Sequence, residues 1–206
     1  MPKFITFEGG EGSGKSTQIK LLKDYFQTLG KSVLLTREPG GTPAAEAIRE
    51  LLLTGHEDKW HKISETLLFQ AARVEHVERV IKPALTEGKI VLCDRFVDST
   101  IVYQGICKQL GVEYIEQLHK FTLDDFRPDF TIILDIAPEI GLKRASSRAG
   151  NETRFENMNI EFHHNVRTGF LQLAEKNPSR YIIINADQDI EQVHADIIER
   201  LASSRA

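Results

Sequence analysis

The feature that most constrains the fold is a glycine-rich segment near the start of the chain. It fits the pattern G-x-x-x-x-G-K-[ST] with the residues Gly9-Gly10-Glu11-Gly12-Ser13-Gly14-Lys15-Ser16. An apolar run, 4–7, precedes it, and a helical stretch, 17–29, follows. In this context the glycines let backbone N–H groups wrap a phosphate chain, while Lys15 adds a cation and Ser16 a hydroxyl for Mg²⁺. The pattern therefore predicts a nucleoside triphosphate site; the alternative is a glycine-rich turn that binds nothing.

The composition is that of a globular protein and argues against several other classes. Hydrophobic residues make up 41% of the 206 residues and charged residues 27%, both ordinary values. The net charge of −4 argues against a nucleic-acid partner, because such proteins usually carry a basic face. Since we find no long apolar stretch and no signal-peptide region, we expect no membrane segment and a cytoplasmic location. Cys93 and Cys107 are expected to be free thiols, and the histidines lack the spacing of zinc ligands.

Short apolar runs alternate with amphipathic segments along the whole chain. Strands are predicted at 3–8, 32–36, 90–93, 130–135 and 181–185, and helices at 15–29, 43–53, 63–87, 97–104, 112–123, 138–147, 157–176 and 189–203. This alternation predicts one α/β domain over 1–206, with a five-stranded parallel sheet and helices on both faces. Within 63–87, a stripe at three- and four-residue steps is predicted to face the core: Ile63, Leu67, Ala71, Val74, Val77 and Ile81.

Charged residues follow several of the predicted strands. Arg37 begins the turn 37–42, Asp94 and Arg95 follow the third strand, and a basic segment at about 143–156 comes after the fourth. Ligands of open parallel sheets bind beyond the carboxyl ends of the strands, so we expect these groups to converge on a second phosphorylated molecule. Asp94 has the position of an acid near Mg²⁺ in phosphate-loop enzymes. The plainer alternatives are surface arginines, a strand-end cap and a solvated helix face.

Phe69 and Arg73 are predicted to bind a nucleotide base. They lie four residues apart and off the apolar stripe, so they share a helix face on which Phe69 can stack against a base and Arg73 can hydrogen-bond its edge. A phenylalanine at helical spacing is more often a core residue, and that alternative stays open. Ser99 and Tyr103 form a similar pair, with Gln104 adjacent.

Three segments together resemble the thymidylate kinase family, whose members phosphorylate dTMP with ATP. They are FEGGEGSGKST at 7–17, REPGGT at 37–42, and DRF at 94–96 followed by Ser99, Tyr103 and Gln104. The first segment alone is shared with many kinases, whereas the three together are close to unique. The resemblance covers essentially the whole chain and implies a P-loop NTPase fold, a basic flap (LID) at about 143–156, and a homodimer.

The resemblance also implies a role for each matching residue. Glu11 contacts the sugar 3′-hydroxyl, Phe69 stacks on thymine, and Tyr103 lies under the deoxyribose. ATP binding is implied for Gly9, Gly10, Glu11, Gly12, Ser13, Gly14, Lys15, Ser16 and Thr17; dTMP binding for Glu11, Arg37, Phe69, Arg73, Arg95, Ser99, Tyr103 and Gln104; Mg²⁺ for Ser16 and Asp94; catalysis for Lys15, Arg95, Arg148 and Arg154.

The sequence departs from the family pattern at two positions, one of which indicates the branch. Some members carry an arginine beside the acid of the phosphate loop, and this chain has Gly12 there. The missing charge is expected from Arg148 and Arg154 of the flap, as in the bacterial-type branch. Phe96 stands where a tyrosine often follows Asp-Arg, which leaves the arginine clamp unaffected.

Two other functions remain as alternatives to dTMP phosphorylation. The first is another small-molecule kinase with a phosphate loop, acting on a different nucleotide or a sugar acid; such an acid offers no base for Phe69 to stack on. The second is an NTPase switch that phosphorylates nothing. A guanine-specific switch would need an N-K-x-D segment, and the sequence contains none.

Overall fold

Five short strands form one parallel sheet, as the alternating pattern predicts. The computed structural model describes residues 2–146 and 154–203. In the spatial order β2-β3-β1-β4-β5, all adjacent strands are parallel. All five residues of the central strand β1 are buried, because helices cover both faces of the sheet. The strands are β1 (Phe4–Glu8), β2 (Val33–Arg37), β3 (Ile90–Asp94), β4 (Phe130–Asp135) and β5 (Tyr181–Asn185).

The helices follow the predicted boundaries to within a few residues, with two π-helical segments that the pattern did not predict. The helix predicted at 63–87 is interrupted by η1 (Val77–Ile81), and the helix predicted at 97–104 continues as η2 (Ile101–Cys107). The α-helices are α1 (Lys15–Thr28), α2 (Pro43–Leu53), α3 (Lys62–His76), α4 (Lys82–Thr86), α5 (Val97–Thr100), α6 (Val112–Leu123), α7 (Pro138–Ala145), α8 (Ile160–Lys176) and α9 (Ile190–Ser203).

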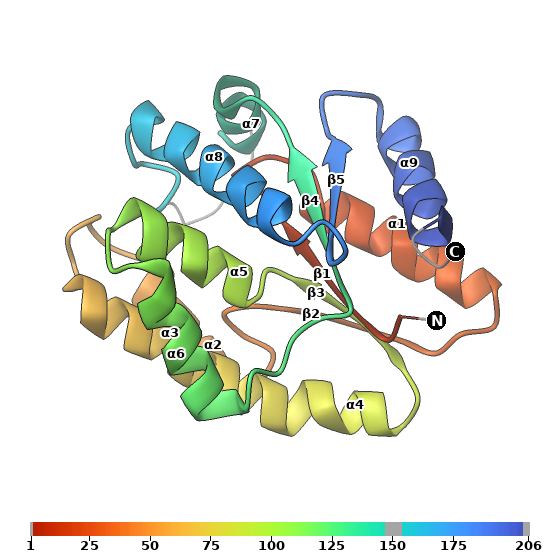
Figure 1. Cartoon of the computed structure of the whole chain (residues 1–206), viewed down its shortest axis with the longest axis horizontal. Coiled ribbons are helices and arrows are strands. Elements are labelled where there is room, and N and C mark those ends of the chain that lie inside the picture. Colours follow the sequence, from red (N-terminus) through yellow and green to blue (C-terminus); the bar gives the residue numbers. More distant parts are fainter. Residues whose placement is uncertain (1, 147–153, 204–206) are drawn as a thin grey trace.

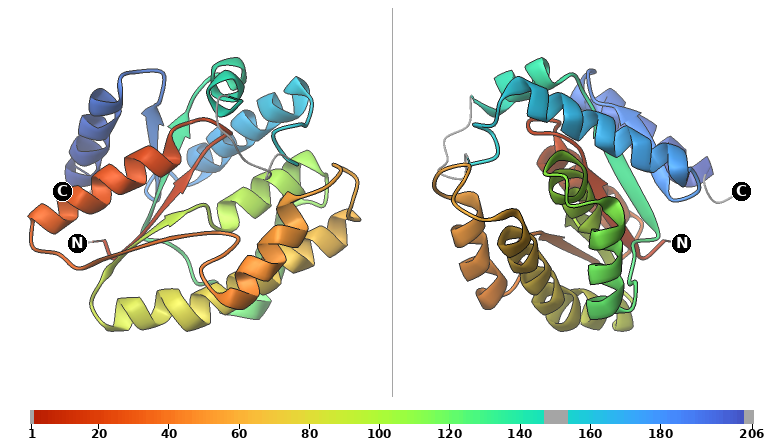
Figure 2. Two further views of the ribbon diagram at one scale, coloured as in Figure 1. Left: turned by 180° about the vertical axis from the view of Figure 1, so that it is seen from behind. Right: turned by 60° about the vertical axis from the view of Figure 1, so that its left-hand side comes forward.

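The helices bury one hydrophobic core on each face of the sheet (Figures 1 and 2). Leu22 and Phe26 of α1 and Ile197 of α9 pack with strand side chains on one face. On the other face, Phe96 and Phe170 belong to a second core with side chains from α4, η2 and α8. The two cores hold the sheet rigidly between them, which gives the loops at its edge a fixed support.

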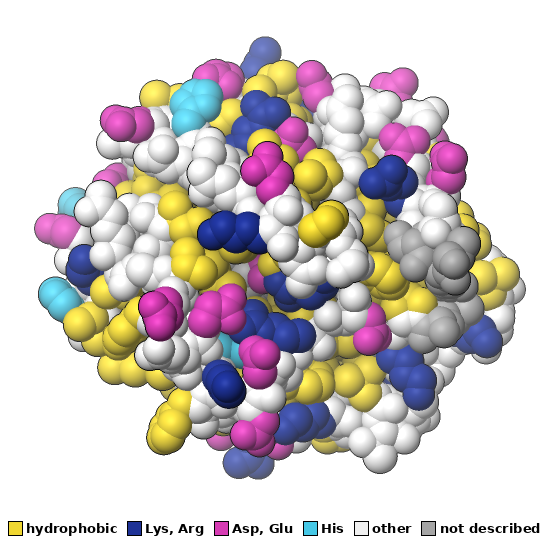
Figure 3. Space-filling model, viewed as in Figure 1, with side chains coloured by type: hydrophobic (Ala, Val, Ile, Leu, Met, Phe, Trp, Pro, Cys, Tyr) yellow, Lys and Arg dark blue, Asp and Glu magenta, His cyan; other side chains and the backbone are white. Residues whose placement is uncertain are grey.

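The surface is mixed in charge. Side chains of both signs are interspersed over the face shown in Figure 3, without a large area of one sign. Within residues 2–146 and 154–203, no helix is both long and apolar enough to cross a membrane.

The predicted core stripe of α3 is wrong over its first half. Ile63 and Leu67 are 39% and 48% exposed, and Ala71 is exposed as well. The buried face is instead largely polar and consists of Glu65, Thr66, Gln70, Ala72, Arg73 and His76. Amphipathic periodicity assumes that the polar face meets water, whereas this polar face turns toward buried ion pairs and a cleft.

The carboxyl ends of the strands place the predicted site residues at one edge of the sheet. The phosphate loop follows β1, and Arg37 and Asp94 are the last residues of β2 and β3. Their backbones are paired in register, and Phe7 of β1 lies beside Asp94 on the other side. Parallel pairing of three neighbouring strands therefore brings three distant parts of the sequence together.

Candidate active site

A cleft of about 380 Å³ lies at this edge of the sheet. The phosphate loop forms one wall, and the other walls come from the ends of β2 and β3, from α2, α3 and η2, and from residues 155–156. Most of the predicted site residues line it: Glu11, Gly12, Ser13, Gly14, Lys15, Ser16, Arg37, Phe69, Arg73, Asp94, Arg95, Ser99, Tyr103 and Gln104. The dimensions fit small-molecule sites, which commonly measure ~300–1,000 Å³.

Lys15 is held inside the phosphate loop. Its Nζ donates to the carbonyl oxygens of Gly9 and Gly10 at 3.0 and 2.8 Å, and lies 3.3 Å from Ser13 Oγ. Burial and the nearby Arg95 charge lower the pKa of Lys15 to about 8. The ammonium group is therefore weakly solvated and directed at the point where a phosphate chain meets the loop.

Two glycines allow the phosphate loop to rest on α7. Gly12 has a φ of +66°, and a Cβ there would lie 1.8 Å from the carbonyl oxygen of Gly141. A Cβ on Gly141 would lie 2.3 Å from the carbonyl oxygen of Glu11. Only glycine fits at either position, so the structure gives a steric reason for the absence of an arginine at residue 12.

Ser16 and Asp94 lie side by side, as expected of a magnesium site. Ser16 Oγ donates to Asp94 Oδ2 at 3.0 Å, across 78 residues of sequence. Hard oxygen donors of this kind suit Mg²⁺, which usually takes one or two protein ligands together with waters and phosphate oxygens. Among the described residues, no group of three or more His, Cys, Asp or Glu side chains forms a complete metal cage.

Arg95 connects the third strand to the acid of the phosphate loop. Its backbone has a left-handed φ of 68°, and its amide donates to the carbonyl oxygen of Phe7 at 2.9 Å. Its guanidinium donates to Glu11 Oε1 at 2.7 Å and to Ser99 Oγ at 3.0 Å. Tyr103 donates its hydroxyl proton to the same Glu11 oxygen at 3.1 Å. Burial opposes ionisation of Glu11, but the charges of Arg95 and Lys15 outweigh it and lower the pKa of Glu11.

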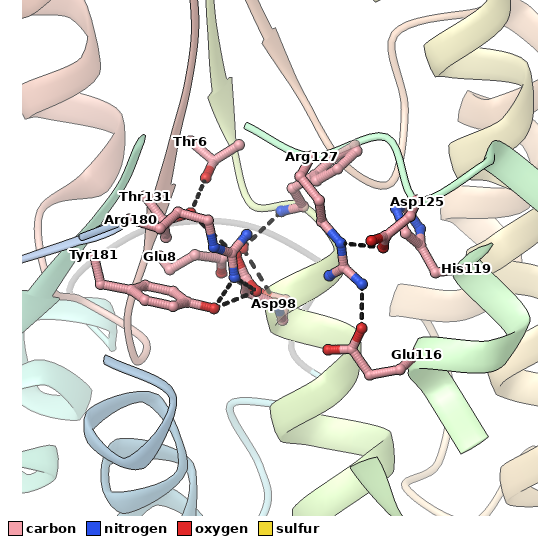
Figure 4. A network of polar contacts seen from close by, with 12 residues as sticks. Thr6, Glu8, Asp98, Glu116, His119, Asp125, Arg127, Thr131, Arg180 and Tyr181 are labelled. Carbon is pink, nitrogen blue, oxygen red and sulfur yellow. Dashed lines mark hydrogen bonds and ion pairs between the residues drawn. The ribbon is translucent and has the colours of Figure 1, made fainter. Parts of the chain in front are cut away.

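A buried acidic side chain, Glu8, supports the turn that carries Arg95. Glu8 accepts hydrogen bonds from the amides of Phe96 and Ser99 at 2.8 and 3.3 Å, and from the Ser99 hydroxyl at 2.6 Å. Figure 4 shows Glu8 beside Asp98, which accepts hydrogen bonds from Arg180, Tyr181 and Thr131. Burial, together with the charge of Asp98, raises the pKa of Glu8 to about 8. Ser99 thus links Glu8 to Arg95.

Arg73 points into the cleft from a buried network. Its Nε donates to Glu38 Oε2 at 2.7 Å, Nη1 to Gln70 at 3.0 Å, and Nη2 to Thr100 at 2.9 Å. Three of its five N–H groups are accounted for, which fixes the guanidinium plane. Phe69, one turn earlier, is half-buried and also lines the cleft.

The remaining predicted residues lie at the rim of the cleft, are bonded to other side chains, or lie outside the cleft. Arg37 is half exposed and pairs with Glu46 at 3.0 Å, at the rim of the cleft. Gln104 lines the cleft, but its Nε2 donates to Glu65 at 2.9 Å. Gly9 and Gly10, at the start of the loop, line a small second cavity together with residues of β4, α7 and α8. Thr17 lies in the first turn of α1.

The structure does not bring Arg154, one of the two predicted flap arginines, to the phosphate loop. Arg148 lies outside the described residues. Arg154 is 2% exposed and donates to the backbone carbonyls of Leu52, His56 and Glu57. The expectation that Arg154 faces the transferred phosphoryl group is therefore not met in this structure, because the end of α2 and the loop after it surround its guanidinium.

Sequence reasoning missed four acidic or aromatic residues of the site. Glu8 carried a usable signal, since it is a charged residue in an otherwise buried strand. Glu38 and Glu65 were hidden by the misassigned face of α3, which made Glu65 itself and the partners of Glu38 on that helix appear exposed. Phe155, which lines the cleft, had no sequence signal, because nothing in its neighbourhood predicts contact with η2.

Comparisons with known proteins show which family the chain belongs to. The family model described as thymidylate kinase matches residues 7–197. The chain belongs to the thymidylate kinase family. It is 48% identical to a thymidylate kinase of Caulobacter vibrioides, over 94% of this chain and 93% of that protein. It is 50% identical to one of Magnetococcus marinus, over 95% and 93%. The crystal structure of thymidylate kinase from Ehrlichia chaffeensis has a TM-score of 0.79 at 38% identity, covering 96% of this chain and 97% of that one.

Proposed function

We propose that this chain transfers the γ-phosphoryl group of ATP to dTMP, which yields ADP and dTDP for dTTP synthesis. The observation that carries the proposal is that a single cleft joins the phosphate loop to Phe69, Arg73 and Tyr103. A kinase of a nucleoside monophosphate needs both halves, whereas an NTPase that phosphorylates nothing needs only the first. Membership of the thymidylate kinase family selects dTMP as the acceptor.

The donor side of the reaction rests on the phosphate loop. Lys15 exchanges its loop carbonyl partners for phosphate oxygens when ATP binds, and the loop amides bind the rest of the phosphate chain. Ser16 and Asp94 are the residues that would hold Mg²⁺, which neutralises charge on the phosphates. These roles are supported by the 3.0 Å contact between the two side chains.

The acceptor side rests on Arg95, Glu11 and Tyr103. Arg95 and Arg37 hold the dTMP phosphate, and Glu11 accepts a hydrogen bond from the 3′-hydroxyl of the sugar. Tyr103 is buried, and its ring fills the space that a ribose 2′-hydroxyl would occupy. Its hydroxyl already contacts Glu11, which supports placing the two against the same sugar.

The chemistry needs positioning more than acid–base catalysis. The attacking atom is a phosphate oxygen that is already largely ionised at neutral pH, so a strong general base is unnecessary. Lys15 and Arg95 stabilise the charge that spreads over the transferred phosphoryl group, and they hold donor and acceptor in line. Arg148 is proposed to add charge from the flap.

The base is proposed to lie between Phe69 and Arg73. Phe69 stacks on thymine, Arg73 donates to its edge, and Gln104 supplies a further polar contact. Glu38, Gln70 and Thr100 fix the guanidinium of Arg73. A rigid donor discriminates strongly, because a base that cannot accept its hydrogen bond leaves it buried and unpaired.

We also propose a homodimer in the cytoplasm. The neighbouring helices α3 and α6 expose apolar side chains, and Phe121 of α6 is 88% exposed while Leu67 of α3 is 48% exposed. Contiguous exposed apolar surface typically marks an interface. The free thiols of Cys93 and Cys107 suit a reducing compartment. Light scattering of the purified chain tests the dimer, and a monomeric mass at micromolar concentration would rule it out.

A panel of acceptors tests the proposed reaction. ADP production is measured with ATP and Mg²⁺ alone, and then with dTMP, dUMP, UMP, dCMP, AMP and GMP. We expect dTMP to give the highest kcat/KM and UMP much less than dUMP. Equal ADP production with and without every monophosphate would indicate an NTPase that phosphorylates none of them. Preference for another monophosphate would replace dTMP as the substrate.

A further inference from the structure

Arg154 occupies the carboxyl end of α2. Its Nε donates to the carbonyl oxygen of His56 at 2.9 Å, Nη1 to that of Leu52 at 3.0 Å, and Nη2 to that of Glu57 at 2.7 Å. Its backbone amide lies 3.4 Å from the carbonyl oxygen of Leu53. Leu52 and Leu53 end the helix, where carbonyls lack intrahelical partners and the dipole is negative. The guanidinium therefore satisfies the Leu52 carbonyl, the backbone amide satisfies that of Leu53, and the side chain carries the charge that a helix carboxyl end favours.

The same guanidinium belongs to a buried cluster around Glu65. Arg154 Nη2 lies 2.5 Å from Glu65 Oε2, and the Glu65 side chain is fully buried. Glu65 also accepts from Lys108 Nζ at 2.7 and 2.9 Å and from Gln104 Nε2 at 2.9 Å. One carboxylate thus joins α3, the end of η2 and the segment at residue 154. Loss of one partner would leave a buried charge incompletely compensated.

Phe155 connects this cluster to the cleft, because its ring contacts the cations of the cluster and lines the cleft. Its ring lies 5.6 Å from Tyr103 in an edge-to-face arrangement and 6.2 Å from Phe69. Arg154 Cζ and Lys108 Nζ lie 5.1 and 5.5 Å from the ring centroid, within the range of cation–π attraction. The two cations of the cluster therefore hold a third aromatic side chain against the two that the proposed function assigns to thymine and deoxyribose.

We propose that Arg154 is a positioning residue of the nucleoside monophosphate pocket. Through Phe155 it fixes the aromatic wall, and through Glu65 it fixes the amide of Gln104. It is not a charge donor to the transferred phosphoryl group, because its N–H groups are committed to three carbonyls and Glu65. This inference rests on the proposed function, since it concerns recognition of the acceptor nucleotide.

Steady-state kinetics of Arg154→Met test the inference. With ATP saturating and dTMP varied, we expect KM for dTMP to rise on the order of tenfold or more, whereas kcat and KM for ATP stay within about threefold. This split is the signature of lost acceptor binding without loss of transition-state contacts. A large fall in kcat with an unchanged KM for dTMP would overturn the proposal and make Arg154 a catalytic residue.

Matched variants separate positioning from general damage. Arg127→Met removes another paired arginine, one that contacts Glu116 and Asp125 and lies outside the residues that line the cleft, and it should retain wild-type kinetics. Phe155→Leu leaves the charged cluster in place and should reproduce the rise in KM for dTMP. If Arg154→Met does not fold, Phe155→Leu decides: an unchanged KM for dTMP would refute the aromatic wall. Wild-type enzyme without dTMP turnover would instead refute the proposed function.

Discussion

At the scale of the residue, the phosphate loop holds the ammonium group of Lys15 in a fixed position before a phosphate binds. Three oxygen atoms of its own loop surround the ammonium group, and burial lowers its pKa. Water therefore competes weakly with a phosphate for this charge. A preorganised cation needs little rearrangement when negative charge develops in the transition state.

Replacement of Lys15 by alanine tests this role. We expect kcat to fall by about a hundredfold or more, because the lost charge partner acts on the transferring phosphoryl group. The protein should still fold, because Lys15 is the first residue of α1 and its side chain bonds only within the loop. Circular dichroism checks the fold, and a coupled ADP assay measures kcat. Near-normal turnover would exclude the phosphate loop as the catalytic site.

At the scale of the element, the phosphate loop and α7 approach so closely that a Cβ atom at the contact point would overlap the other backbone. Each of Gly12 and Gly141 faces a backbone carbonyl of the other element. This contact sets the position of the loop relative to β4, because α7 begins three residues after that strand. A charged side chain at residue 12 is sterically excluded. Any further cation that stabilises the transferred phosphoryl group must therefore come from elsewhere in the chain.

Gly141→Ala distinguishes this contact from ordinary helix propensity. Alanine in a helix interior normally stabilises by about 0.5–1 kcal/mol relative to glycine. Here we expect the opposite sign, a loss of about 1–3 kcal/mol, because the methyl group overlaps the Glu11 carbonyl. Thermal unfolding measures the difference. Gly10→Ala is the control, since a Cβ there meets nothing within 4 Å; a stabilised Gly141→Ala protein would contradict the close approach.

At the scale of the whole molecule, two buried titratable groups contribute to how stability depends on pH. His119 Nε2 donates to the carbonyl oxygen of Phe126 at 2.7 Å, and burial, with the charge of Arg73, lowers the pKa of His119 to about 4. Glu8 has a pKa raised to about 8. Both groups therefore favour the neutral form in the folded protein, because neither site is solvated enough to hold a full charge.

The two groups should change the free energy of unfolding in opposite directions, over pH windows that overlap between about 4.5 and 6.5. Unfolding lets His119 bind a proton below pH 6.5, so its contribution to stability is lost as the pH falls from about 6.5 to 4. Glu8 loses a proton on unfolding above pH 4.5, so stability falls as the pH rises from about 4.5 to 8. Each unit of pH within these windows changes the free energy of unfolding by at most about 1.4 kcal/mol per group.

Chemical denaturation of two variants from pH 4 to 9 tests this assignment. Compared with wild type, His119→Gln should lose less stability as the pH falls from about 6.5 to 4, and Glu8→Gln should lose less stability as the pH rises from about 4.5 to 8. Glu8→Gln should therefore gain stability relative to wild type as the pH rises towards 8. If the free energy of unfolding varied with pH in the same way for the wild type and both variants, neither group would be the source of the pH dependence.

Much of the fold and the site follows from local patterns in the sequence. The strand at 130–135 and the helix at 112–123 were predicted with the observed boundaries, because apolar runs and periodicity mark buried elements directly. The phosphate loop, Asp94-Arg95 and Tyr103 were found because their spacing and their positions at strand ends are visible in one dimension. Arg154 was misplaced because a basic residue near glycine and asparagine gives no sign of a buried partner 89 positions away.

The sequence by itself determined the order of the strands and helices, the phosphate loop and the family resemblance. Those features depend on short-range chemistry: periodicity, glycine conformations and fixed motif spacing. Only the tertiary structure decided that the polar face of α3 is buried, that Gly12 abuts α7, and that Arg154 joins Glu65 behind the nucleotide pocket. Each of these three features depends on which groups, distant in the sequence, compensate a buried charge or fill a space. Those contacts form only when the helices and strands pack together.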